Sequence, residues 1–158
     1  MRLAIARLDV LSQPVRIAIV GYPFSSYSDS EFAKHGFDKQ SWKDTIVQEA
    51  TGNIEAAIQG QGYRFIRVID RLRITRTLEE QSLSFTGAIS EDEATKAGKL
   101  CGATHILYWT LSRSPAGSKF VPFAGVVPMM EDLITQRLID AETGEVLATQ
   151  VRTVKKRF

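Results

Sequence analysis

The sequence contains few of the residues from which covalent or metal-based sites are built. Its 158 residues include one cysteine, Cys101, and two histidines, His35 and His105. An intrachain disulfide is therefore excluded. A structural zinc site takes about four Cys or His ligands, and three such residues do not supply them. We expect neither a metal nor a cofactor.

Long apolar runs and a strong charge bias are also missing. No stretch approaches the roughly 18 consecutive apolar residues of a membrane-spanning helix. Residues 1–9 are too few and too charged for a secretory signal peptide. The formal net charge of +2 gives no argument for nucleic-acid binding. With 44% hydrophobic and 24% charged residues, the composition indicates a folded globular chain, and we expect a single domain over residues 1–158.

No catalytic constellation is found in the sequence. No Gly-x-Ser-x-Gly segment occurs, and the glycine pair of residues 60–62 precedes a predicted strand, whereas a phosphate-binding loop follows one. The polar stretch around His35 includes Asp29, Glu31 and Asp38, the composition of a loose metal or acid–base site. We interpret this stretch as a solvated loop within an irregular segment over residues 25–40. A hydrolase or metal-binding enzyme that uses the His35 loop is kept as an alternative.

Apolar periodicity predicts a mixed β-sheet packed with helices, the α/β (α+β) class. The predicted strands are rich in β-branched and aromatic residues and span residues 15–20, 63–69, 104–111, 133–139 and 145–154. Helices are predicted over residues 41–60, 71–81 and 90–101. The apolar run over 104–111 indicates a strand covered on both faces.

Particular residues are expected to set the element boundaries. The stretch from Gly21 to Phe24 is expected to end the first strand. Ser41, with Asp44 three residues later, is expected to start the long helix, and Gly52 to mark close packing or a bend within it. Ser90 and Glu93 form a capping box for the last helix, and Gly102 is its expected C′ glycine.

Several short motifs resemble those of the curli-secretion CsgG family. They are Asp70-Arg71, the stretches Leu78–Gln81 and Gly98–Ala103, Thr86-Gly87, and a hairpin segment at Arg137–Leu147 with a central Thr-Gly-Glu turn. The resemblance covers residues 15–156. It implies a compact three-layer unit similar to an anticodon-binding domain, with its core over residues 15–156 and residues 1–14 as an N-terminal arm or edge strand.

The resemblance is to members of the family that lack a pore. Pore-forming members contribute amphipathic hairpins whose spanning strands need about 9–11 residues each. Residues 113–132 are too few for two such strands and include Pro122 and Pro128. The chain is therefore more similar to PelC-like ring lipoproteins and LpoB-like penicillin-binding-protein activators. Cys101 cannot carry a lipid anchor, so an anchor would lie upstream of Met1.

Residues 118–130 concentrate apolar side chains where a loop should be polar. The two prolines predict a loop and not a central strand. Two interpretations stay open: a loop folded over the core, or a surface that contacts another subunit, a partner or a membrane surface. The candidate contact residues are Phe120, Val121, Phe123, Val126, Val127 and Met129.

The resemblance implies a non-enzymatic protein of the bacterial envelope. We expect a homo-oligomeric ring or an adaptor in secretion, export or surface-structure assembly, with other envelope proteins as partners and no nucleic acid. A monomeric periplasmic activator that binds a cell-wall synthase is the alternative. The corresponding location is periplasmic or associated with the outer membrane, with a cytoplasmic location left open.

Overall fold

A computed structural model describes residues 14–34, 36, 38–60, 65–70, 74, 76–77, 80 and 90–157. Within them, five strands form one mixed sheet in the order β2-β1-β3-β4-β5. β1 (Val15–Ser25) lies between β2 (Ile66–Val68) and β3 (His105–Val121) and is parallel to both. β3, β4 (Gly125–Asp140) and β5 (Val146–Arg157) form an antiparallel meander. The predicted mixed sheet of the α/β (α+β) class is confirmed.

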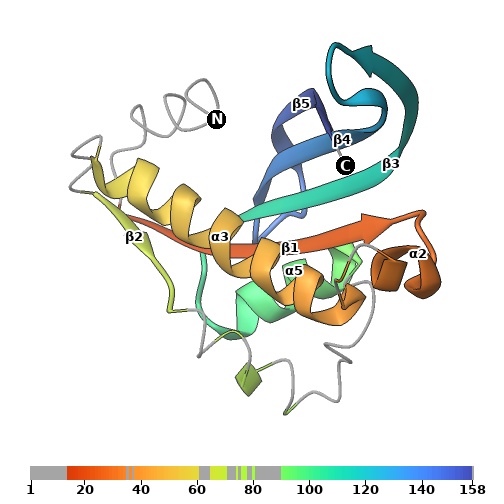
Figure 1. Ribbon diagram of the computed structural model, residues 1–158. Helices are drawn as coiled ribbons and strands as arrows, with labels where there is room; N and C mark the ends of the chain where they lie inside the picture. Colours follow the sequence, from red (N-terminus) through yellow and green to blue (C-terminus); the bar gives the residue numbers. More distant parts are fainter. Residues whose placement is uncertain are drawn as a thin grey trace.

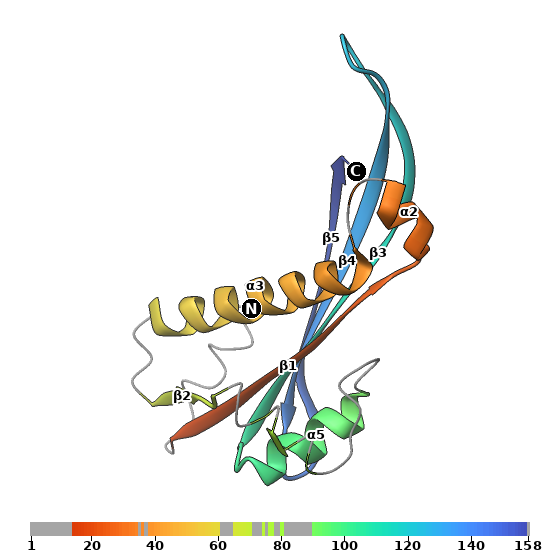
Figure 2. The same ribbon diagram turned by 60° about the horizontal axis from the view of Figure 1, so that its bottom comes forward.

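Helices cover both faces of this sheet. α3 (Lys39–Gly60) lies against one face and α5 (Glu91–Leu100) against the opposite face, which gives three layers (Figures 1 and 2). A short helix, α2 (Asp29–Lys34), follows β1. Among the described residues, no helix is long and apolar enough to cross a membrane. The helix predicted over 71–81 lies mostly outside the described residues, as do the predicted N-terminal arm and the Thr86-Gly87 motif.

Side chains of β1 alternate between two separate cores. Val15, Ile17 and Ile19 pack with Ile54 and Ile58 of α3. Their neighbours on the other face, Ala18 and Val20, pack with small residues of α5. A central strand that is buried on both faces reads as a continuous apolar run, which is why the sequence located β1 and β3, although both strands extend beyond their predicted ends.

β1 continues beyond the point at which the sequence predicted its end. Gly21 pairs in register with Trp109, and a Cβ at position 21 would lie 1.8 Å from Trp109 Cε2, so only glycine leaves room for the indole. Pro23 is accommodated because β2 pairs with β1 only as far as Ile17. Val15 N and Ile17 O both form hydrogen bonds with the chain on the β2 side. Every second residue of a strand directs its backbone groups to the same side, so the backbone of Pro23 also faces this side, where no described strand pairs with β1 beyond Ile17.

Two predictions about the first half of the chain are wrong. α3 begins at Lys39, because Asp38 and not Ser41 is its cap: Asp38 Oδ2 accepts a hydrogen bond of 2.6 Å from Ser41 N. The segment expected to be irregular over 25–40 contains α2, whose Phe32 is buried against Trp42. Isolated aromatic residues in a polar stretch were the signal for this small helix.

Of the predictions about helix caps and glycines, those for the α5 capping box and Gly102 are confirmed, and the one for Gly52 is wrong. The Ser90–Glu93 capping box of α5 is present, and Gly102 has a φ of 75° beyond the end of the helix, as predicted. Gly52 is exposed, and no atom lies within 4 Å of the position its Cβ would take. The expectation that Gly52 marks close packing is therefore wrong.

A matched pair of glycine substitutions tests this description of the core. Gly21→Ala should lower the free energy of unfolding by about 1–3 kcal/mol, because the added methyl group meets the Trp109 indole. Gly52→Ala should raise it by about 0.5–1 kcal/mol, because the position is helical and open. Urea denaturation of both variants measures the two changes; a stable Gly21→Ala protein would contradict the assigned register of β1 and β3.

Candidate functional site: the projecting hairpin

Residues 118–130, here called the hairpin tip, extend the sheet as a two-stranded ribbon. β1 pairs with β3 only as far as Arg113, and β5 pairs with β4 only from Met129 onward. Beyond these points, the residues on either side of the turn pair only with each other within the described part of the chain. Figure 2 shows this ribbon projecting away from the three-layer body. The prediction of a loop, and the interpretation of a loop folded over the core, are wrong.

The prolines that suggested a loop occupy positions that a hairpin tolerates. Pro122 lies in the turn between β3 and β4. Pro128 lies past the last residue of β4 that pairs with β5, which is an edge position. Pro115 borders an irregularity in register between Pro115 and Ser118, where Gly117 has a φ of 82°. That irregularity is a β-bulge, with one extra residue on β3.

The hairpin tip exposes large apolar side chains. Phe120 and Val126 face each other across the two strands and are each 71% exposed, and Phe123 is 110% exposed in the turn. The other candidate contact residues, Val121, Val127 and Met129, are partly buried. From Ser114 to Met130 the sequence carries one charge, on Lys119. An apolar cluster of this kind on a projecting element is typical of an interaction surface.

The backbone of Phe123 adds to this interpretation. Phe123 has a φ of 69°, and it is the one residue other than glycine with a positive φ in the described part of the chain. The left-handed region is unfavourable for a bulky side chain, by about 1–2 kcal/mol. A turn selected for stability alone would place Gly, Asn or Asp there. An exposed phenylalanine at this position indicates a role outside folding.

A buried ion pair fixes the base of the hairpin. Arg113 of β3 donates to Asp132 of β4 through Nε (2.7 Å to Oδ1) and Nη2 (2.8 Å to Oδ2), and the Asp132 side chain is 1% exposed. The Arg113 guanidinium carbon lies 4.9 Å from the centroid of the Trp42 ring on α3. Charge-assisted bonds and a cation–π contact therefore connect both strands to the helix. Sequence reasoning missed this pair, although opposite charges inside two apolar strands were a usable signal.

The acids near His35 have structural partners. His35 itself lies outside the described residues. Glu31 accepts hydrogen bonds from the backbone N–H and hydroxyl of Ser28, and these bonds lower the pKa of Glu31. The bond from Ser41 N lowers the pKa of Asp38 in the same way. Asp29 lies 3.4 Å from Lys39 Nζ. In the described part of the chain, no group of three or more His, Cys, Asp or Glu residues could hold a metal ion.

His105 is a core residue. It is 7% exposed at the start of β3, and its Nδ1 lies 3.0 Å from Thr104 Oγ1. Burial lowers the pKa of His105, while the charge of Asp140 opposes that shift. Asp140 in turn accepts hydrogen bonds from the backbone N–H groups of Glu142 and Thr143, which lower its pKa and order the β4–β5 turn. The predicted hairpin with a Thr-Gly-Glu turn is confirmed.

Comparison with known proteins identifies the fold. No protein-family model matches the chain, and no characterised protein matches it in sequence. Among solved structures, the LpoB C-terminal domain from Salmonella enterica superposes with a TM-score of 0.59 at 15% identity, over 98% of this chain and 94% of that chain. Lipoprotein GNA1162 from Neisseria meningitidis gives 0.57 at 16% identity, over 91% of this chain and 84% of that chain.

A PelC dodecamer structure from Paraburkholderia phytofirmans has a lower TM-score. It is 0.43 at 12% identity, over 94% of this chain and 76% of that chain, which is too low to support an argument. The matched structures include an LpoB domain, one of the proteins that the sequence resemblance named, but membership of the CsgG family is not confirmed. At these identities, the likeness to LpoB and GNA1162 establishes a shared fold.

The ion pair at the hairpin base can be tested by removing one charge. Asp132→Asn should lower the free energy of unfolding by about 3 kcal/mol, because it leaves the buried Arg113 charge uncompensated. Glu131→Gln is the matched control: Glu131 pairs with the exposed Lys155, so its loss should change stability by less than about 1 kcal/mol. Equal effects of the two substitutions in chemical denaturation would show that the Arg113–Asp132 contact does not hold the hairpin.

Proposed function

We propose that this chain is a non-enzymatic protein of the bacterial envelope that acts by binding other proteins through its hairpin tip. The observation that carries this proposal is the exposed apolar surface of Phe120, Phe123 and Val126 on a ribbon outside the core. Apolar surface gains free energy when a partner covers it, at about 25 cal/mol per Å². A ribbon held by a buried ion pair is already ordered, so binding costs little conformational entropy.

Within this proposal, an adaptor that docks on a cell-wall synthase in the periplasm is the preferred form. The shared fold with an LpoB domain, at a TM-score of 0.59, supports it over 98% of the chain. The second form is a homo-oligomeric ring in secretion, export or surface-structure assembly. Its support is the edge position of β5: in the described sheet, the outer side of this 12-residue strand pairs with no other strand and is available for pairing with another copy.

The proposal assigns no catalytic role to the acids near His35. Glu31 and Asp38 accept backbone hydrogen bonds at the starts of α2 and α3, where a carboxylate satisfies free N–H groups. These bonds lower the pKa of both side chains, which makes each carboxylate a weaker general base. Helix capping accounts for their presence without an enzymatic reaction.

Cross-linking at the hairpin tip tests the proposal. A photo-reactive residue in place of Phe120 should give one defined cross-linked product in the cells that produce the protein. Phe123→Asn should remove the product, because it deletes the apolar ring, and should keep or raise the melting temperature, because Asn tolerates a positive φ. Leu100→Gln on α5, where Leu100 is 56% exposed, is the matched control and should leave the product unchanged.

The identity of the product separates the two forms. A cross-link to a different protein supports the adaptor, and a cross-link between copies of this chain supports the ring. Absence of any product, or a product that persists in Phe123→Asn, would contradict a contact role for the hairpin tip.

A further inference from the structure

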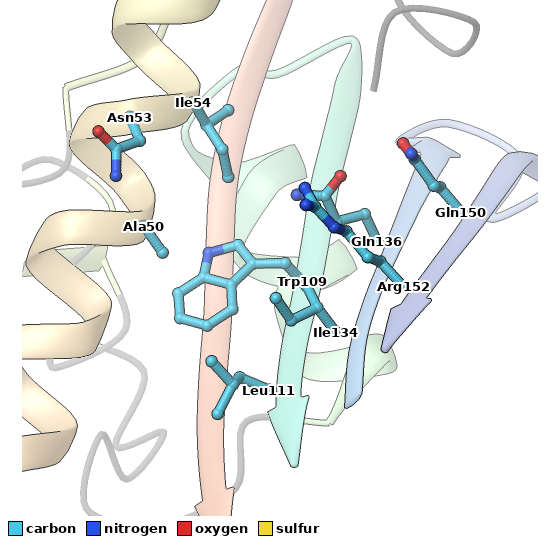
Figure 3. A pocket seen from close by; sticks show the side chains of 9 residues that line it. All are labelled: Ala50, Asn53, Ile54, Trp109, Leu111, Ile134, Gln136, Gln150 and Arg152. Atoms are coloured by element: carbon cyan, nitrogen blue, oxygen red, sulfur yellow. The ribbon is translucent and has the colours of Figure 1, made fainter. Parts of the chain in front are cut away.

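A cavity of about 390 Å³ lies on the α3 face of the sheet, away from the hairpin tip. α3 forms one wall and β5 the other, and the strands β3 and β4 form the floor (Figure 3). Trp109, Leu111 and Ile134 make this floor apolar, and Trp109 and Leu111 are buried. A volume above about 300 Å³ with an apolar floor is typical of a small-molecule site.

The rim of the cavity is polar. Asn53 projects from α3, Gln136 from β4, and Gln150 and Arg152 from β5. Asn53, Gln150 and Arg152 are exposed, so the cavity is open to solvent at its rim. Within the part of the chain that the structure describes, the side chains of these four residues form no hydrogen bond or ion pair with the protein. Their hydrogen-bonding groups are therefore available to a ligand.

The positive charge of the cavity lining favours an anionic ligand. Arg152 is the one charged residue among the nine described residues that line the cavity, and none of the nine is a carboxylate. A guanidinium offers only donors, in a planar fork that fits the two oxygens of a carboxylate. The indole Nε1 of Trp109 is buried next to Gly21 of β1 and has no acceptor among the described residues. Figure 3 shows this nitrogen on the ring edge that faces α3.

We propose that this cavity binds a small amphipathic carboxylate of the size of an acylated amino acid. Arg152 pairs with the carboxylate, the carboxamides of Asn53, Gln136 and Gln150 bond to the amide group, and the apolar part lies on Leu111 and Ile134. This binding site uses none of the residues of the hairpin tip, so it does not rest on the proposed function.

A nuclear magnetic resonance titration of the full chain tests the site, because the sequence contains two tryptophans. The indole N–H signal of Trp109 should move when N-acetyl-L-leucine is added at millimolar concentrations. The signal of Trp42 should not move, because Trp42 does not line the cavity. The Trp42→Phe variant assigns the two signals.

Two controls isolate the carboxylate contact. N-acetyl-L-leucinamide, which lacks the charge, should bind about five- to tenfold more weakly, as loss of a charge-assisted bond at an open site implies. Arg152→Gln should weaken binding of the acid to a similar degree. Lys155→Gln, which removes an equal charge from β5 outside the cavity, should leave the affinity unchanged.

Three results would overturn the site. The first is a Trp109 signal that does not move, or that moves together with the Trp42 signal. The second is equal affinity for the acid and the amide, or an equal loss in the Arg152 and Lys155 variants. The third is inorganic phosphate binding as tightly as N-acetyl-L-leucine, which would show a general anion effect without a role for the apolar floor.

Discussion

The contact between Arg113 and Asp132 holds the hairpin together at the place where β1 stops pairing with β3. Below it, β1 and β5 flank the two central strands; above it, β1 no longer pairs with β3, and β5 continues to pair with β4 only as far as Met129. An isolated two-stranded hairpin is marginally stable in water, so the direction of the tip depends on its base. A buried ion pair adds little net stability, but it favours one strand register over others. Through Trp42, the same pair also fixes the hairpin relative to α3.

The two candidate surfaces of the protein lie along the same pair of strands. Leu111 and Ile134 form part of the cavity floor, and two residues further along the strands come Arg113 and Asp132. The hairpin tip follows beyond the bulge at Pro115. α3 shapes both regions, because it forms one wall of the cavity and supplies the Trp42 ring at the hairpin base. One helix and two strands therefore position the protein-binding surface and the small-molecule site.

Sequence reasoning predicted the elements whose signals are local. The buried strands, the capping box at Ser90 and the β4–β5 turn follow from runs and motifs of a few residues. It failed where the structure depends on a residue distant in the sequence. Gly21 lies inside a strand because the Trp109 indole needs the space beside it, and Pro128 is tolerated in β4 because it does not pair with β5. The apolar character of residues 118–130 was visible in the sequence. Their projection from the body could not be predicted from the sequence, because it depends on where β1 and β5 stop pairing with β3 and β4.

The measurement that tests this account most directly is the distance between a spin label on the hairpin tip and one on α3. Ala124 and Glu49 are both exposed and suit labelling as cysteines in a Cys101→Ser background. Because the ion pair and Trp42 fix the hairpin base to α3, pulsed electron paramagnetic resonance should give a single narrow distance distribution. A broad distribution, or a population at short distance that reports the tip folded onto the body, would contradict a rigid, projecting contact surface.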